Sequence, residues 1–183
     1  VDVLPDQAIT GCDEGLFEDI SAEYGNFTPA PDGTGMIEDM ANSGVTNLSD
    51  CCAPQIFWSY VVFYDPTNFP GAVPTTMADF YDTTTFPGKR GIHTWAQANI
   101  EMALVADGVD PTQVYNILSN QTGAIDRAFD KLDTIKEDIV FWSAGSKPLE
   151  LVSSGEVVMA LAYNGRIGAA ILSEGKDFEY IWD

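Results

Sequence analysis

The sequence predicts an α/β fold built on a central, mainly parallel sheet flanked by helices. Short apolar, β-rich runs alternate with segments whose apolar residues recur every three to four positions, which is the pattern of strands joined by crossover helices. Hydrophobic residues make up 45% of the 183 residues, so the chain has enough apolar material to bury a core. One domain or two small lobes are expected at this length.

The first third of the chain has weak signals for regular structure. A strand end is expected over residues 1–5, and a short helix with turns over residues 7–20. Residues 24–49 are rich in Gly, Pro, Asn and Asp and lack apolar periodicity, which predicts a long irregular loop. Loops of this length are uncommon in compact domains unless they are functional or restrained.

Regular alternation begins at residue 56. The run "IFWSYVVFYD" over residues 56–65 is apolar on both faces, which predicts a buried central strand. A short helix follows Pro74, where Thr75 or Thr76 is placed to cap it. The expected elements after it are a strand over 90–94, helices over 95–106, 110–118 and from 122, a strand over 138–142, a helix over 148–153, a strand ending at 163, a helix from 164 and a strand over 178–182.

Two of these elements carry specific expectations. In "LAYNGRIGAAIL", residues 161–172, an alternating run ends at Tyr163 and helical spacing follows, so Asn164 is expected to cap a helix at the strand end. The helix from residue 122 has its large apolar residues on one face: Ile125, Phe129, Leu132 and Ile135.

The chain is strongly acidic. It has 28 Asp and Glu residues against 8 Lys and Arg residues, a formal net charge of −20 at pH 7. Because nucleic acids and anionic membrane surfaces are bound by clustered Lys and Arg, neither is expected as a partner. The charge is interpreted as a solvated surface, with attraction of a cationic ligand as the alternative. No apolar run is long enough to span a bilayer, so no membrane insertion is expected.

Motifs of catalysis and cofactor binding are not found. There is no Gly-x-Ser-x-Gly elbow, no Walker loop and no dinucleotide fingerprint after a strand. The single histidine, His93, excludes a His-rich metal site and leaves a Ser-His-Asp arrangement as the catalytic alternative. Asp32, Glu38 and Asp39 lie near glycines without EF-hand spacing. No cofactor and no metal are therefore expected.

The three cysteines are Cys12, Cys51 and Cys52, with no Cys-x-x-Cys motif and no histidine partner to indicate zinc or redox chemistry. Buried thiols and one disulfide are both compatible with the spacing. We favour a disulfide between Cys12 and Cys51, which would restrain the irregular loop and indicates an oxidising compartment.

Aromatic residues recur where predicted strands end and helices begin. Trp58 lies in the central strand, Trp95 at a strand-to-helix junction, Trp142 directly before Ser143, and Tyr163 at a strand end. Ligands of open α/β sheets bind beyond the carboxyl ends of the strands. Each ring by itself is explained as a core residue, but together they predict a shallow aromatic box for a small solute or cation.

The chain resembles the extracellular solute-binding proteins of ABC importers, the spermidine/putrescine-binding group in particular, in three stretches: "GKRGIHTWAQANIEMALVADGVDP", "AFDKLDTIKEDIVFWSAGSKPLELVSSGEVVMALAYNGRI" and "FEYIWD". The resemblance is strongest over residues 153–166 and weakest over 24–49. "GCDEGL", followed later by a Cys before Trp-Ser, is similar to a branch with a cysteine pair, and the offset to Trp58 matches Cys51 better than Cys52.

This resemblance implies a type II periplasmic-binding-protein-like fold, in which two α/β lobes joined by a hinge close on a ligand. Measured against that plan, the chain looks incomplete, and its start at Val1 suggests a processed or excised product. Residues 1–55 would be a partial first-lobe segment with the irregular loop. Residues 56–183 would be the second-lobe α/β domain, ending at the hinge crossover.

The resemblance also implies which residues bind the ligand: Asp6, Gln7, Trp58, Trp95, Ala98, Ser143 and Tyr163. In the well-known polyamine binders, the two positions at the helix start are acidic and hold the amines. Here they are Trp95 and Ala98, and without those carboxylates a desolvated ammonium must rely on ring faces.

Two functional hypotheses follow. The favoured one is a non-catalytic substrate-binding component of an ABC importer, periplasmic or extracellular, which delivers a polyamine or another small polar solute to a membrane permease. An amino-acid-derived or metal-bound ligand is the close competitor within this class. The alternative is an acidic extracellular α/β hydrolase that uses His93 with one of the serines.

Overall fold

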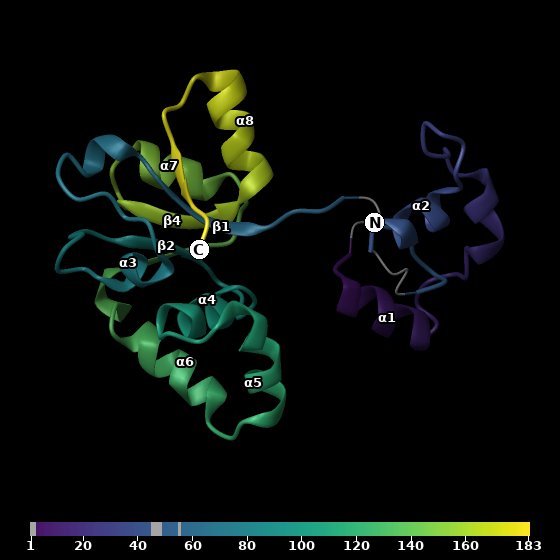
Figure 1. Ribbon diagram of the computed structural model, residues 1–183, viewed down its shortest axis with the longest axis horizontal. Helices are drawn as coiled ribbons and strands as arrows, with labels where there is room; N and C mark the ends of the chain where they lie inside the picture. Colours follow the sequence, from purple (N-terminus) through teal and green to yellow (C-terminus); the bar gives the residue numbers. More distant parts are fainter. Residues whose placement is uncertain (1–2, 45–48, 55) are drawn as a thin grey trace. The chain divides into compact units, whose positions relative to one another are not determined.

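The computed structural model describes residues 3–44, 49–54 and 56–183 (Figure 1). It divides into two compact units, Val1–Phe57 and Trp58–Asp183. Each unit is described by itself below.

The first unit is built from three short helical segments. They are α1 (Pro5–Asp13), the 3₁₀ helix η1 (Ser21–Asn26) and α2 (Met36–Asn42). Proline in the first turn suits the start of α1, because that position has no helical hydrogen bond to lose. The expected irregular loop over 24–49 was wrong in part, because α2 lies within it; residues 45–48 of that loop lie outside the described residues.

A disulfide between Cys12 and Cys51 joins α1 to the end of this unit, as expected, across a sequence separation of 39 residues. In the chain-entropy model, closing a loop of this length stabilises the folded state by about 4 kcal/mol. The Tyr24 hydroxyl lies 3.1 Å from the carbonyl oxygens of both Ser49 and Cys52, next to the disulfide. Cys52 is outside the disulfide.

The second unit is a five-stranded mixed sheet in the order β3-β2-β4-β1-β5. The strands are β1 (Tyr60–Tyr64), β2 (Arg90–His93), β3 (Ile139–Trp142), β4 (Met159–Tyr163) and β5 (Glu179–Ile181). β2 is parallel to β3 and β4, as expected, but β1 runs antiparallel to both of its neighbours, β4 and β5. The α/β class is confirmed, and the mainly parallel sheet is corrected to a mixed one.

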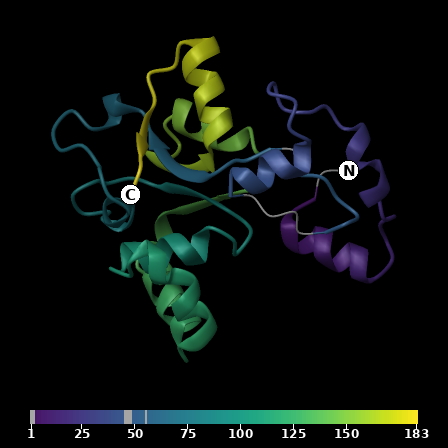
Figure 2. The same cartoon turned by 45° about the vertical axis from the view of Figure 1, so that its right-hand side comes forward.

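Helices cover both faces of the sheet, as Figures 1 and 2 show. One face carries α3 (Met77–Tyr81), α4 (Asn99–Ala106), α5 (Val114–Asn120) and α6 (Ala124–Asp133), and the other carries α7 (Lys147–Ser153) and α8 (Asn164–Glu174). Three 3₁₀ turns complete the unit: η2 (Pro66–Asn68), η3 (Pro111–Gln113) and η4 (Lys136–Asp138). None of the helices in the described ranges is both long and apolar enough to cross a membrane.

β1 divides the core into two layers because successive side chains of a strand point to opposite faces. Val62 and Tyr64 pack with α3, α4 and α6, whereas Val61 and Phe63 pack with α7 and α8. The expected buried central strand is therefore confirmed. It is shorter than expected, because the strand begins only at Tyr60.

Two helices differ from expectation. The helix expected from Trp95 begins at Asn99, after Ala98 adopts a left-handed backbone with φ of 67°. The expected apolar face of the helix from residue 122 is wrong in part. Ile135 is buried and Leu132 packs against the core, as expected, but Ile125 and Phe129 are exposed and the buried residues of α6 are Ala124 and Ala128. Small alanines let α6 approach α4 closely, and the large side chains on the neighbouring positions are left outside.

Gly91 is expected to be sensitive to substitution because its strand lies close to β4. A Cβ at Gly91 would lie 2.9 Å from the Cβ of Ala160, its register partner. Gly91→Val should lower the free energy of unfolding by about 1–3 kcal/mol through overpacking, as measured by urea denaturation. Gly165→Ala is the matched control, since nothing lies within 4 Å of its Cβ position. Equal stability of the two variants would contradict this packing argument.

Candidate functional site

Strand register places four rings at the end of the sheet where β2, β3 and β4 terminate. β1 begins at this same end, because it runs antiparallel to β4. Tyr60 is therefore paired directly with Tyr163, and His93 with Trp142, with ring centroids 4.9 Å and 4.4 Å apart. The two pairs also contact each other, at 6.2 Å between Tyr60 and His93 and 5.8 Å between Trp142 and Tyr163.

Two tryptophans border this group of rings. Trp58 stands nearly perpendicular to Tyr60 and Tyr163, with centroids 5.1 Å and 5.0 Å away, and Trp95 lies 4.5 Å from His93. We call the six rings the aromatic cluster: Trp58, Tyr60, His93, Trp95, Trp142 and Tyr163. His93 and Trp142 form a buried base, whereas Trp58 and Trp95 are 36% and 49% exposed and remain accessible to a ligand.

The two tyrosines of the cluster are joined through their hydroxyls. Tyr60 Oη lies 3.2 Å from Tyr163 Oη. Burial, together with this hydrogen bond, raises the pKa of Tyr60 above its ordinary value. Tyr60 is therefore neutral at physiological pH and offers a ligand a hydroxyl rather than a negative charge.

The corner between β4 and α8 is held by Asn164 in an unexpected way. Its side chain does not cap α8; instead Asn164 Oδ1 accepts a hydrogen bond from the Ser59 N–H, and the Asn164 N–H donates to the Ser59 carbonyl, each at 3.0 Å. The expected helix cap is thus corrected to a clamp on the residue before β1. The clamp fixes the chain that carries Trp58 and Tyr60.

Arg166 brings a positive charge to this corner. Both its Nε and the Tyr163 ring lie against Gly145 in the turn after β3: a Cβ there would be 3.7 Å from Arg166 Nε and 3.0 Å from the ring. Within the part of the chain that the structure describes, no ion pair or hydrogen bond of the Arg166 guanidinium is found. An exposed, unpaired guanidinium beside an aromatic ring is suited to binding a carboxylate.

His93 is a structural member of the cluster. It is 1% exposed, and its Nδ1 accepts a hydrogen bond from the Trp95 N–H at 2.9 Å, which leaves the proton on Nε2. Burial lowers the pKa of His93, and a hydrogen bond with the Ser143 backbone opposes this effect only in part. Between described residues, no serine hydroxyl is hydrogen-bonded to His93, so the hydrolase alternative has no support.

The expected ligand-binding residues fall into two groups. Trp58 and Tyr163 are in contact, Trp95 joins them through His93, and Ser143 is exposed directly after Trp142. Asp6 and Gln7 lie on α1 in the first unit, where they border a surface hollow of about 450 Å³. The Gln7 side chain accepts a hydrogen bond from the Leu4 N–H. Their part in a shared site stays a prediction.

Tyr60 and Arg166 were missed by the sequence analysis. In the sequence, Tyr60 is indistinguishable from the other apolar residues of a central strand. It lies beside Tyr163 only because β1 runs antiparallel to β4. Arg166 could have been proposed as a site residue from the sequence, because it lies in the first turn of the helix that follows Tyr163.

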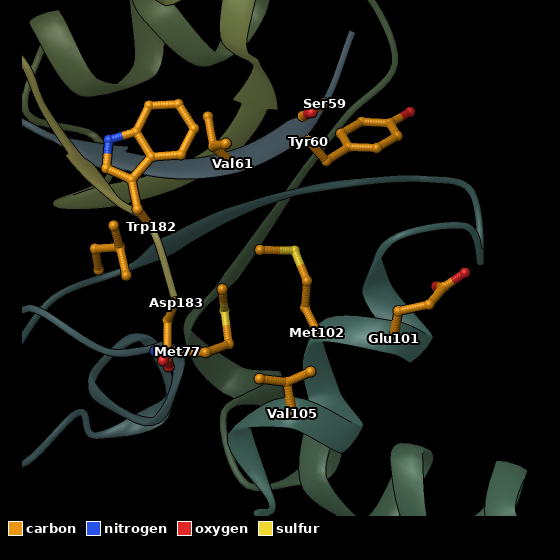
Figure 3. A pocket seen from close by; sticks show the side chains of 10 residues that line it. Ser59, Tyr60, Val61, Met77, Glu101, Met102, Val105, Trp182 and Asp183 are labelled. Carbon is orange, nitrogen blue, oxygen red and sulfur yellow. Dashed lines mark hydrogen bonds between the residues drawn. The ribbon is translucent and has the colours of Figure 1, made fainter. Parts of the chain in front are cut away.

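A hollow of about 280 Å³ lies beside the aromatic cluster and shares only Tyr60 with it (Figure 3). Its lining is mostly apolar, with Met77, Met102 and Val105 facing Val61 and Trp182. This hollow is less suited than the cluster to a small polar solute, because the exposed rings and Arg166 lie outside it. A search of residues 3–44, 49–54 and 56–183 finds no group of side chains with the composition of a metal site.

An open α/β unit with accessible rings and an unpaired guanidinium at the carboxyl ends of its strands is suited to binding a small solute. The chain belongs to the bacterial extracellular solute-binding protein family, whose model matches residues 1–183.

Among relatives, the chain is 39% identical over 183 residues to the gamma-aminobutyric acid-binding protein of Pseudomonas aeruginosa, covering 100% of this chain and 47% of that protein. It is similar to the solved structure of a GABA receptor, with 32% identity, a TM-score of 0.74, and coverage of 100% of this chain and 51% of the other. The PBP MotA from A. tumefaciens B6 in complex with glucopine is 31% identical, with a TM-score of 0.61 over 67% of this chain and 38% of MotA. The chain therefore spans about half the length of the curated relative it matches.

In these comparisons, the spermidine/putrescine-binding group matches the chain at lower sequence identity than the gamma-aminobutyric acid-binding protein does. The spermidine/putrescine-binding protein PotD from Streptococcus pneumoniae is 14% identical, with a TM-score of 0.62 over 97% of this chain and 50% of PotD. At that identity the similarity shows the shared fold alone.

Proposed function

We propose that this chain is part of the substrate-binding component of an ABC importer and that its ligand is a small zwitterion of the GABA type. In this proposal the protein is not catalytic and delivers its ligand to a membrane permease. Identity of 39% to a gamma-aminobutyric acid-binding protein supports the ligand class. The Cys12–Cys51 disulfide supports a periplasmic or extracellular location, because disulfides persist in oxidising compartments.

The unpaired guanidinium of Arg166 beside Tyr163 is the observation that carries the proposal. A ligand carboxylate at Arg166 would receive charge-assisted hydrogen bonds. The exposed faces of Trp58 and Trp95 would hold the ammonium group through cation–π interactions. A ligand with both charges, separated by a short apolar linker, satisfies both parts of the site.

A polyamine fits the same residues less well. It carries two or more ammonium groups and no carboxylate, so Arg166 would repel it. The aromatic cluster itself contains no Asp or Glu, and Trp95 and Ala98 stand where the polyamine binders have acidic residues. The net charge of −20 attracts any cation without specificity, and that attraction is screened by salt.

We further propose that residues 56–183 form the second lobe and residues 1–55 part of the first lobe of a two-lobed receptor. Asp6 and Gln7 would be ligand contacts of the first lobe, and Trp58, Ser143 and Tyr163 ligand contacts of the second lobe. This assignment is supported by the match of the family model along the whole chain.

Calorimetric titration tests the proposed ligand. GABA, putrescine and spermidine are titrated into the 183-residue chain at about 0.05 M and at about 1 M salt. At the higher concentration the Debye length is roughly 3 Å, so long-range attraction by the net charge is screened. A chimera in which the unmatched segments of the Pseudomonas aeruginosa relative flank this chain is titrated in parallel. We expect saturable GABA binding, strongest in the chimera, that persists at high salt, and polyamine uptake that disappears. Salt-resistant spermidine binding without GABA binding would overturn the proposal.

A further inference from the structure

The turn that carries Trp95 is held by two buried polar side chains. We call residues 94–98, between β2 and α4, the Trp95 turn. The Trp95 N–H donates to His93 Nδ1 at 2.9 Å, and Asn99 Nδ2 donates to the carbonyl oxygens of both His93 and Trp95, at 2.6 Å and 2.7 Å. The backbone of Trp95 is thus fixed through its N–H and its carbonyl, while its ring is 49% exposed.

His93 and Asn99 are unusual because they are polar and buried. In the described part of the chain, Arg90 is the other polar or charged residue that is buried. Burying a polar group is unfavourable unless it is hydrogen-bonded. Asn99 is 7% exposed and lies at the first position of α4, but its side chain bonds the turn instead of capping the helix. The hydrogen bonds of the Asn99 side chain therefore hold the Trp95 turn and not the start of the helix.

The end of the turn is conformationally strained. Ala98 has a φ of 67°, a left-handed backbone that a residue with a Cβ adopts at a cost, and among the described residues it is the non-glycine with positive φ. Such strain persists where surrounding contacts over-determine the backbone, and it concentrates at binding sites. Two of the three hydrogen bonds are made by the Trp95 backbone, and the third joins Asn99 to His93 across the turn that Ala98 ends.

We propose that His93 and Asn99 are positioning residues that hold the Trp95 ring in place for the ligand before it binds. This inference rests on the proposed function, in which Trp95 contacts the ligand ammonium. His93 contributes in two ways, because its ring also packs between Trp95 and Trp142, with centroids 4.5 Å and 4.4 Å away. A ring that is already fixed loses little conformational freedom on binding, and this raises affinity.

Fluorine NMR of the 183-residue chain labelled with 5-fluorotryptophan tests the positioning directly. The chain has 4 tryptophans, and the variant Trp95→Phe assigns the Trp95 resonance. We expect Asn99→Ala to shift or broaden that resonance in the absence of any ligand. Asn120→Ala is the matched control, because Asn120 is an exposed asparagine that bonds Asn116 on α5. It should leave the Trp95 resonance unchanged.

Conservative variants separate positioning from general stability. Asn99→Asp keeps the side-chain shape but removes both donors, so it should disturb Trp95 as Asn99→Ala does, and it covers the case in which Asn99→Ala does not fold. His93→Asn keeps an acceptor where Nδ1 lies but loses the ring between Trp95 and Trp142, so it should disturb the Trp95 resonance less than His93→Leu, which loses both. An unchanged Trp95 resonance in Asn99→Asp and His93→Leu would overturn the proposal.

Titration of GABA into the same variants links the ring to binding. We expect Asn99→Ala and Asn99→Asp to bind GABA roughly tenfold more weakly than the parent chain, with His93→Asn between these variants and the parent. Unchanged GABA affinity in a variant whose Trp95 resonance has moved would also overturn the proposal. If the parent chain and the chimera bind no GABA, the proposed function fails, and the resonance of the ligand-free chain still decides whether His93 and Asn99 position Trp95.

Discussion

Arg166→Met is expected to weaken GABA binding by roughly 10- to 150-fold, because a charge-assisted hydrogen bond contributes about 1.5–3 kcal/mol. Calorimetric titration of the variant measures the loss. Arg166→Lys should recover only part of the affinity, since an ammonium lacks the planar fork of donors that matches a carboxylate. Binding of putrescine should stay equal or increase in Arg166→Met, because a positive charge is removed from the site.

Arg127→Met is the matched control for this experiment. Arg127 is an arginine of α6 whose guanidinium is 38% exposed and pairs with Asp107 at 2.6 Å. The control changes the net charge by the same amount as Arg166→Met and leaves the aromatic cluster untouched. Equal GABA affinity in Arg166→Met and Arg127→Met would show that the ligand carboxylate is bound elsewhere.

Arg90→Met is expected to lower the free energy of unfolding by roughly 3–5 kcal/mol, because several buried carbonyls lose their donor and each unsatisfied acceptor costs about 1–3 kcal/mol. The Arg90 side chain is fully buried, and its guanidinium donates to four backbone carbonyls: Phe80, Asp82, Phe86 and Gly88. Methionine would fill much of the space but remove the guanidinium donors from all four carbonyls, of which the Asp82 carbonyl keeps a donor in the Phe86 N–H. Urea denaturation measures the change.

The charge of Arg90 persists despite its burial. Desolvation lowers its pKa to about 10, and the nearby Asp138 and Asp82 oppose that shift, so the guanidinium is still protonated at neutral pH. Its contribution to stability is therefore expected to be constant between about pH 6 and 8. Arg127→Met serves again as the control, because an exposed ion pair contributes only about 0–1 kcal/mol. Equal loss of stability in both variants would contradict the structural role of Arg90.

The parts of the fold that the sequence predicted well are those governed by local rules. Thr76 caps α3 as expected, because a threonine before a short apolar run satisfies free N–H groups at a helix start. The strand ends at His93, Trp142 and Tyr163 lie within one residue of expectation. Apolar β-rich runs that stop at polar or glycine-containing turns are enough to place such ends.

The errors arise where tertiary contacts decide. The direction of β1 depends on a partner strand 103 residues away, so no local pattern contains it, and Tyr60 was missed for that reason. The late start of α4 at Asn99 reflects hydrogen bonds from buried side chains to the Trp95 turn. In α6, alanines form the buried face because close helix packing requires small residues, whereas periodicity gave weight to Ile125 and Phe129.

Part of the candidate site was accessible to sequence reasoning. Four rings of the aromatic cluster were found because aromatic residues at strand ends are visible in the sequence: Trp58, Trp95, Trp142 and Tyr163. The cluster is completed by His93, which was considered as a catalytic alternative and not as a neighbour of these rings, and by Tyr60. The register between strands could not be predicted from the sequence. It is this register that brings residues from separate strand ends into contact.

The position of β1 between β4 and β5 has a consequence for synthesis of the chain. β1 leaves the ribosome first among the strands, yet its partner Tyr163 follows Tyr60 by 103 residues. At about 5–20 residues per second, the apolar segment of β1 waits roughly 5–20 s for a neighbour. During that interval an unpaired, hydrophobic strand edge is open to aggregation. We therefore expect this unit to fold with higher yield when the nascent β1 is protected until β4 and β5 have been made.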